Sequence, residues 1–353
     1  MKKVITTILI VLIAIILLVV AGTALKLYFD GKDFEKGDIL IFYSNDMGLH
    51  SEIASYDQTS LKKKGVKYYN FSGLKSGPGQ IIVDKEKVLI APVGDFKNSD
   101  YRKILSINYK GDIQEKYNID GDISPTAFIV TDNYLYTYSN LNYEFFIKKI
   151  DRTNNGISTI KANNNIIGVS GLTYCNNDVY GTALDLKSST SKIYKYDFDK
   201  LKEIELYEIG SDEDTLEYLV CRDSKLYYAY NGKILYYDTN IKKAEVIVSL
   251  LSKNAIDIII KDNYLFVTEA DPESNLEEST VEIFDINNNK KVSEIKIEGY
   301  EIQSSIDLKN NLWILYSNEE HNYLVKYDYM TGKELTKLKL DDKKTLYVAG
   351  FAI

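Results

Sequence analysis

The stretch YLVKYDYMTGKELTKLKL, from Tyr323 to Leu340, contains an apolar and aromatic run, an aspartate, a turn and a second run. The same arrangement returns along the chain, with the aspartate at Asp57, Asp151, Asp197, Asp238, Asp285 and Asp328. A degenerate copy, INYKGD, carries Lys110 at the position expected for the aspartate. Successive copies lie 41 to 53 residues apart. A period of this length in a β-rich chain is typical of repeated four-stranded sheets.

A second phrase accompanies the first, about 15–25 residues upstream of each turn. Its clearest copies are TDNYLYTY from Thr131, NNDVYGTA from Asn176, DSKLYYAY from Asp223, KDNYLFVT from Lys261 and KNNLWILY from Lys309. Each copy opens with a polar turn and continues as a strand of aromatic and aliphatic residues. Together the two phrases predict an all-β chain built from blades of four antiparallel strands, which is a β-propeller. An unrelated β-sandwich is the alternative, but sandwiches do not keep such a period along the whole chain.

The copies predict seven blades. Blade 1 takes three strands from residues 38–72, and blades 2 to 7 cover 77–119, 122–160, 165–209, 214–250, 255–298 and 300–340. The remaining stretch TLYVAGFAI, Thr345–Ile353, is apolar to its last residue, which is unusual for an exposed tail. We expect it to supply the missing innermost strand of blade 1, which would close the ring and remove two sheet edges.

One turn carries a family resemblance. YDYMTGK, at Tyr327–Lys333, is similar to the Tyr-Asp-x-x-Thr-Gly-Lys turn of the YVTN and quinoprotein-like propellers, and YDTN at Tyr237–Asn240 is a shorter echo. Residues 38–353 therefore resemble this group of seven-bladed propellers. The resemblance implies the architecture and no particular activity, because the fold serves many unrelated functions.

Residues 1–26 predict the location. Lys2 and Lys3 precede 22 uncharged residues, Val4–Leu25, and a helix of that length is about 33 Å long, enough to cross a bilayer core. The lysines place the N-terminus inside, so we expect a single-pass transmembrane signal-anchor in the cell membrane, with an extracellular or otherwise extracytoplasmic propeller. A cleaved signal peptide, which would give a secreted protein, is the alternative. The predicted units are an anchor at 1–26, a linker at 27–37 and the propeller at 38–353.

Composition excludes several partners. The net charge is −8, with 51 acidic against 43 basic residues, so the chain as a whole repels nucleic acid and anionic headgroups. The two cysteines, Cys175 and Cys221, form no C-x-x-C motif, and the only histidines are His50 and His321. Zinc sites and c-type haem attachment therefore lack ligands.

The cysteines leave two pairing states open. Outside the cytoplasm they could form a disulfide. However, Cys175 lies five residues before Tyr180 and Cys221 lies six before Tyr227, a one-residue offset that can turn them to opposite sheet faces. Buried free thiols are therefore the expectation.

The longer connections between strands are expected on one face of the propeller, where binding sites concentrate. They are acidic, and the candidate binding residues are Asp212, Glu213, Asp214, Glu217, Asp271, Glu273, Glu277, Glu278, Glu319, Glu320 and His321. Such a face would attract a cationic peptide, a basic protein or Ca²⁺. The plainer interpretation is that exposed loops of an acidic protein are acidic.

The sequence favours a non-catalytic, membrane-tethered binding or scaffold module for a protein, peptide or envelope partner. It predicts no catalytic residue, metal ligand or cofactor, with Ca²⁺ left open. The main alternative is an enzyme, either a calcium-dependent propeller hydrolase or lactonase or a quinone-cofactor oxidoreductase, for which Asp257 and Gln303 are available near the start of innermost strands. A third class is an assembly factor acting by β-augmentation.

Overall fold

The computed structural model describes residues 34–45, 50–71, 73–74, 80–92, 103–119, 123–141, 144–163, 166–167, 171–210, 218–251, 255–270, 278–318 and 320–353. Over these residues the protein is a seven-bladed β-propeller without a helix. The anchor predicted at 1–26 lies outside them. Within the described part, no helix is long and apolar enough to cross a membrane.

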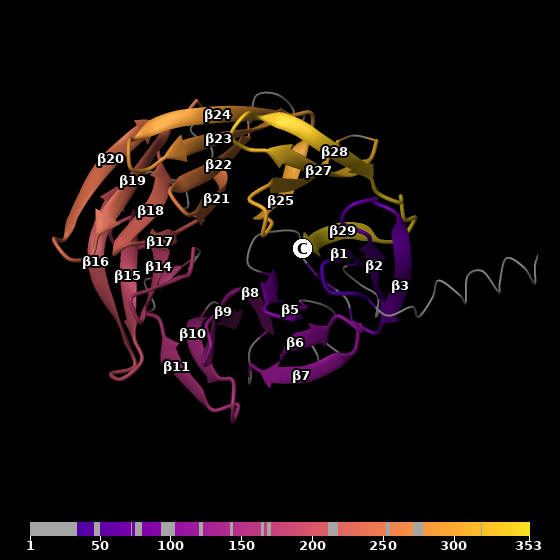
Figure 1. The fold of residues 1–353 in the computed structure, drawn as a ribbon. Helices are drawn as coiled ribbons and strands as arrows, with labels where there is room; N and C mark the ends of the chain where they lie inside the picture. Colours follow the sequence, from indigo (N-terminus) through magenta and orange to yellow (C-terminus); the bar gives the residue numbers. More distant parts are fainter. Residues whose placement is uncertain are drawn as a thin grey trace, which may run out of the picture.

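The seven sheets surround a central axis, and each is antiparallel (Figure 1). In blades 2 to 7 the first strand in sequence is innermost, and in blade 1 the C-terminal strand takes that place. Blade 1 contains β29 (Tyr347–Ala352), β1 (Ile39–Ser44), β2 (Ser51–Tyr56) and β3 (Lys63–Tyr69), and blade 2 contains β4 (Ile81–Asp84), β5 (Lys87–Ile90), β6 (Lys103–Asn108) and β7 (Ile113–Asn118). Blade 3 contains β8 (Ile123–Val130), β9 (Tyr134–Leu141), β10 (Glu144–Asp151) and β11 (Ile157–Lys161). Each of these blades agrees closely with its predicted range.

Blade 4 departs from the four-strand pattern. Its innermost strand is split into β12 (Ile166–Ile167) and β13 (Thr173–Cys175), which both pair with β14 (Asp178–Asp185), followed by β15 (Thr190–Asp197) and β16 (Lys202–Gly210). Blade 5 contains β17 (Val220–Arg222), β18 (Lys225–Tyr230), β19 (Lys233–Asp238) and β20 (Lys243–Ser249). Blade 6 contains β21 (Ala255–Lys261), β22 (Tyr264–Ala270), β23 (Ser279–Asp285) and β24 (Lys290–Ile297), and blade 7 contains β25 (Tyr300–Ile306), β26 (Leu312–Ser317), β27 (Asn322–Asp328) and β28 (Lys333–Lys339).

The recurring aspartate is a turn cap. At the end of the third strand, its side chain accepts backbone N–H groups two or three residues ahead, as Asp57 does from Thr59 and Ser60 at 3.1 and 2.6 Å. Asp238 does the same from Asn240 and Ile241. These N–H donors, with the Ser60 hydroxyl, hold the pKa of Asp57 below its usual value. The phrase recurs because each outer hairpin requires the same local acceptor.

Blade 2 corrects the alignment of the degenerate copy. Its third strand ends at Asn108, whose side-chain oxygen accepts the N–H of Asp112 at 2.8 Å. The placement of Lys110 at the aspartate position is therefore wrong by two residues. The amide oxygen of asparagine caps the turn in place of a carboxylate.

The blades pack through apolar seams, each filled by side chains from two neighbouring sheets. Between blades 7 and 1, Trp313 of β26 is fully buried among Leu315, Val348 and Phe351. Its Nε1–H donates to Asp307 at 3.0 Å, which satisfies the one polar group of the ring. Trp313 is therefore a core residue.

The C-terminal strand lies innermost in blade 1. β29 pairs antiparallel with β1, with Leu40 opposite Ala352 and Ile41 opposite Phe351. Gly350 lets the Gln303 side chain of the neighbouring blade approach this strand closely, because a Cβ there would lie 2.6 Å from Gln303 Oε1 and would displace it. The first and last strands of the described chain therefore share one sheet.

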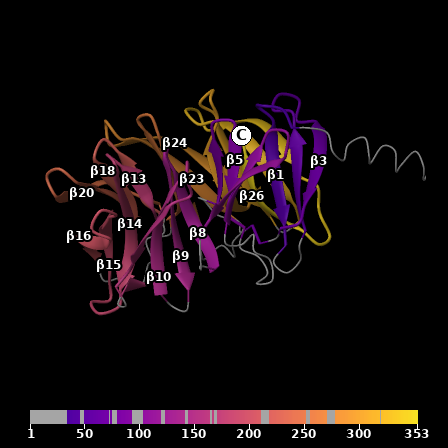
Figure 2. The same ribbon diagram turned by 90° about the horizontal axis from the view of Figure 1, so that it is seen from below.

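Figure 2 views the wheel edge-on, with the strands running between its two faces. The connections from first to second and from third to fourth strands form one face, here called the turn face. The connections from second to third strands and between blades form the other, here called the loop face. The C-terminus lies at the turn face, where Ala352 pairs with Leu40.

Candidate functional site

Most predicted acidic residues lie outside the described residues: Asp212, Glu213, Asp214, Glu217, Asp271, Glu273, Glu277 and Glu319. The three that are described lie on the loop face. Glu278 precedes β23 and is exposed, and Glu320 and His321 lie between β26 and β27. Their positions do not test binding, so the acidic binding face stays a prediction for all of these residues.

His321 contacts the connection between blades 7 and 1. Its Nδ1 lies 3.0 Å from Asp342 Oδ2, and its Nε2 lies 3.8 Å from Glu320. The backbone N–H of His321 donates to Asn318 at 2.9 Å, which closes a tight turn. The imidazole of His321 therefore binds the connection between blades 7 and 1 through Asp342.

His50 of blade 1 is linked to the same connection through Glu52. Its Nε2 lies 3.3 Å from Glu52 Oε1, and its ring stacks on Tyr68. Glu52 also pairs with Lys343 at 2.7 Å, and Lys343 follows the Asp342 that contacts His321. His321 therefore contacts the segment that leads into β29 directly, and His50 is joined to it through Glu52.

Two pairs of carboxyl groups are buried on opposite faces of blade 6: Asp257 with Glu301 in the seam with blade 7, and Glu269 with Glu282 in the seam with blade 5. Asp257 of β21, Glu269 of β22, Glu282 of β23 and Glu301 of β25 are all at most 5% exposed. Lys291 donates to Glu282 at 2.9 Å, and the Ser304 hydroxyl donates to Glu301 Oε1. The other oxygen of Glu301, Oε2, is buried without a hydrogen-bond partner.

The protonation states of these carboxyl groups differ. Burial and the nearby Glu301 raise the pKa of Asp257 well above its usual value, and burial raises the pKa of Glu301 to about 7. Burial opposes ionisation of Glu282 too, but hydrogen bonds with Glu269, Lys291 and the Leu251 N–H lower its pKa overall. The Asp257–Glu301 pair can therefore hold or release a proton near neutral pH, since burial and mutual repulsion oppose ionisation of both carboxyl groups.

Sequence reasoning named Asp257 and Gln303 but missed Glu301, Glu269 and Glu282. Those three carboxylates interrupt strand-forming segments, and nothing in the spacing shows that Glu301 meets Asp257 across a seam or that Glu269 meets Glu282 within blade 6. A usable signal would have been glutamates inside otherwise aromatic and aliphatic strands, because such positions face a seam.

Gln303 occupies the position in blade 7 that Asp257 occupies in blade 6. Both follow a bulge in the innermost strand, opposite Leu315 and Thr268 respectively. The Gln303 side chain donates to the Phe351 carbonyl at 3.1 Å and accepts the Phe351 N–H at 2.8 Å. It thus holds β29 from the neighbouring blade as a backbone strand would.

Gln303→Met is expected to destabilise the propeller by about 2 kcal/mol, because it keeps the side-chain length but leaves two partly buried backbone groups of Phe351 unpaired. Urea unfolding would measure the change, and the Phe351 amide should exchange with solvent faster. Gln114→Met on exposed β7 is the matched control, expected near zero. Equal stability of the two variants would contradict the role given to Gln303.

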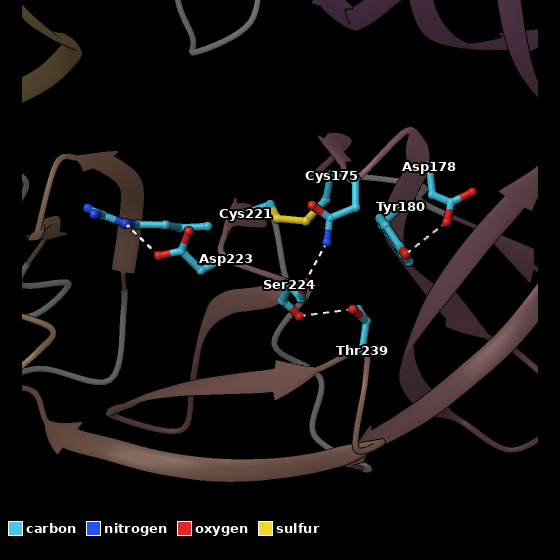
Figure 3. The surroundings of a disulfide bond; sticks show 9 residues. Cys175, Asp178, Tyr180, Cys221, Asp223, Ser224 and Thr239 are labelled. Atoms are coloured by element: carbon cyan, nitrogen blue, oxygen red, sulfur yellow. Dashed lines mark hydrogen bonds and ion pairs between the residues drawn. A yellow bond between two sulfur atoms is a disulfide. The ribbon is translucent and has the colours of Figure 1, made fainter.

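A disulfide joins Cys175 of β13 to Cys221 of β17, the innermost strands of blades 4 and 5 (Figure 3). Their Cα atoms lie 5.8 Å apart, within the usual range. Beside it, the Asn176 side chain donates to the Ser224 hydroxyl at 2.6 Å, and the Thr239 hydroxyl donates to the Ser224 carbonyl. The inner turns of the two blades are therefore held both covalently and by hydrogen bonds.

The expectation of free thiols is wrong, although the offset behind it is real. Cys175 pairs with Asp178 next to its turn, whereas Cys221 pairs with Leu226, one position farther from its own. Opposite faces of successive blades point into the same seam. The offset therefore directs both sulfur atoms into the seam between blades 4 and 5, where they share an apolar cluster with Leu219.

The described residues contain no group of three or more His, Cys, Asp and Glu arranged to hold a metal ion.

Comparisons with known proteins support the fold and do not identify a function. No family model matches the chain, and no curated protein matches it. Similar solved structures include a candidate 6-phosphogluconolactonase from Bacteroides fragilis, with a TM-score of 0.59 and 10% identity over 90% of this chain and 99% of that chain.

A second candidate 6-phosphogluconolactonase, from Bacteroides uniformis, has a TM-score of 0.56 and 11% identity over 90% of this chain and 99% of its own. A protein of unknown function from Desulfotomaculum acetoxidans has a TM-score of 0.58 and 13% identity over 84% of this chain and 94% of its own. At such identities the likeness establishes the seven-bladed fold alone.

Proposed function

We propose that this chain is a non-catalytic binding or scaffold module, tethered to a membrane on its extracytoplasmic side, that presents the loop face to a basic protein or peptide. The tether is the apolar run Val4–Leu25, and Lys2 and Lys3 keep its start in the cytoplasm. The proposal divides the chain into the anchor at 1–26, the linker at 27–37 and the propeller at 38–353.

The observation that carries this placement is the Cys175–Cys221 disulfide. Disulfides persist in oxidising compartments and are rare in the cytosol, where thiols are kept reduced. A bridge between two blades therefore supports an extracytoplasmic propeller, which agrees with the orientation expected from the N-terminal lysines.

The binding role rests on the distribution of connections and charge. The loop face carries the exposed carboxylates Glu278 and Glu320, and most of the other acidic residues predicted to bind lie in connections of the same kind. A negative field over this region favours a cationic partner.

Two finer features of the fold belong to this proposal. The pairing of β29 with β1 supports closure of the wheel by the C-terminal strand, and the turn at Tyr327–Lys333 supports placement among the YVTN-type propellers. Gly332 in that turn has φ = +69°, and a Cβ there would lie 2.8 Å from the Glu294 carbonyl oxygen. Both facts explain why the motif has glycine at this position.

The placement is tested by expressing the full chain and fractionating the cells. We expect it in the membrane fraction, degraded by protease added outside, with Cys175 and Cys221 alkylated only after reduction. The double variant Cys175→Ser and Cys221→Ser controls for unspecific labelling. A soluble protein that is protected from external protease and has two reactive thiols would contradict the placement.

The binding role is tested by crosslinking to a lysine-rich peptide with the purified chain. Glu278→Lys with Glu320→Lys should weaken capture several-fold, whereas Asp132→Lys with Asp199→Lys, an equal charge change at exposed positions on the turn face, should not. A parallel melt with calcium separates the enzyme alternative, since a large stabilisation at micromolar Ca²⁺ would indicate a metal site instead.

A further inference from the structure

The described chain enters the propeller at the turn face. Lys36 pairs with Glu86, in the turn between β4 and β5, at 2.8 Å. Lys64, just after the turn between β2 and β3, pairs with Asp38 at 2.9 Å. The Phe34 ring lies against Gly111, in the turn between β6 and β7. Three separate turns of blades 1 and 2 therefore fix the entry point on one face.

The reach of the preceding chain is short. Eight residue steps separate Lys26 from Phe34, and a fully extended chain covers at most about 28 Å in that distance. An eight-residue strand such as β14 is itself about 26 Å long. A chain that starts at the turn face would use nearly all of this reach to bring the loop face to a bilayer.

The turn face also has interfacial chemistry. Four large apolar side chains are exposed in its turns, at Leu201, Ile241, Leu308 and Met330, with exposed fractions of 53, 65, 104 and 45%. Each has an exposed lysine within three residues, at Lys200, Lys242, Lys309 and Lys333. Apolar side chains next to lysines suit the boundary between headgroups and acyl chains, where the lysine stem lies along apolar surface and its ammonium group meets phosphate.

From the entry point, the reach and this chemistry, we propose that the turn face lies on the phospholipid headgroups of the membrane that holds the anchor, and that the loop face points away from it. This orientation rests on the tether of the proposed function. The turn face also carries the capping aspartates, such as Asp238 and Asp328. The tether therefore holds the face at the bilayer, and the four lysines offset part of the repulsion between carboxylates and phosphate.

The orientation is tested with the full chain in phosphatidylcholine vesicles that contain a lipid with a quencher on its headgroup. Single variants carry a fluorophore on a new cysteine, with the native disulfide intact. Ile241→Cys and Met330→Cys report on the turn face, and Glu278→Cys and Glu320→Cys report on the loop face. We expect quenching at least three times stronger on the turn face, with or without added anionic lipid.

Equal quenching on both faces, or stronger quenching on the loop face, overturns the orientation while leaving the tether in place. A full chain that does not float with the vesicles overturns the tether and the orientation together. Two positions on each face keep the result readable if one labelled variant fails to fold. Ile241→Glu with Met330→Glu should reduce turn-face quenching, read from a label at position 308, at least twofold.

Discussion

Deletion of Thr345–Ile353 is expected to abolish cooperative folding of the propeller. The deletion removes β29, and with it the buried side chains of Leu346, Val348 and Phe351. Each contributes about 1.5–3 kcal/mol by burial, so their sum is comparable to the whole stability of a typical domain, about 5–15 kcal/mol. Urea unfolding followed by circular dichroism would show no sigmoidal transition, and the truncated chain should aggregate.

The second cause of this loss is the exposed edge. Without β29, the strand from Ile39 to Ser44 loses its inner partner, and the backbone of a fully buried strand faces the channel unpaired. Gln303 loses both of its hydrogen bonds to Phe351 as well. Seams on both sides of blade 1 are therefore opened at once.

A circular permutant provides the control. Because Ala352 lies opposite Leu40, residues 345–353 can be placed before residue 38 through a short Gly-Ser hairpin. This variant should restore a cooperative transition. Deletion of Ile353 alone should cost little, since it lies beyond β29 and is partly exposed. A truncated chain that stays soluble and melts cooperatively would falsify the structural role of the strand.

Glu301→Gln is expected to stabilise the protein by about 3 kcal/mol at pH 8 and to have little effect near pH 4. In the folded state the pKa of Glu301 is raised from 4.5 to about 7. Ionising this buried carboxyl group therefore costs about 3 kcal/mol relative to the unfolded chain, at 1.36 kcal/mol for each pKa unit. Glutamine keeps the acceptor for Ser304 and removes the charge.

The sign of the pH dependence follows from the raised pKa. A carboxyl group that binds its proton more tightly when folded favours folding below pH 4.5. It loses that advantage as the pH rises through about 7. Wild-type stability should therefore fall between pH 4.5 and 7 relative to Glu301→Gln. The neighbouring Asp257, whose pKa is also raised, acts in the same direction.

Urea unfolding of both proteins at pH 4, 6 and 8 would measure this difference. Glu278→Gln, an exposed glutamate on the same face, is the control, and its curve should follow the wild type. Parallel pH profiles for wild type and Glu301→Gln would show that the Glu301 carboxylate is ionised without cost. That result would contradict the proton-binding role given to Asp257 and Glu301.

The blades were predictable because their signals are local. An aspartate such as Asp238 caps a turn through contacts within three residues, so sequence spacing alone locates the hairpin. The same local logic misplaced the blade 2 turn, since Asn108 provides an equivalent acceptor with a different residue type. The split of the innermost strand of blade 4 had no local signal.

The seams were not predictable in the same way. Which residues meet there depends on which faces of successive sheets are opposed. The one-residue offset between Cys175 and Cys221 was identified correctly. It was expected to separate the two sulfur atoms, but it directs both into one seam, where they form a disulfide. For the same reason the meeting of Asp257 with Glu301 went unseen, although Asp257 was already a candidate. Predicting a contact across a seam requires the relative orientation of neighbouring blades, which a single sequence does not give.

The sharing of blade 1 by both chain ends has a mechanical consequence. A force pulling on Phe34 acts along β1, which is hydrogen-bonded on one side to β2 and on the other to β29. Both ladders would be loaded in shear, so their bonds resist together and cannot be opened one at a time. Blade 1, which would carry a mechanical load transmitted through Phe34, is thus arranged to resist unfolding under that load.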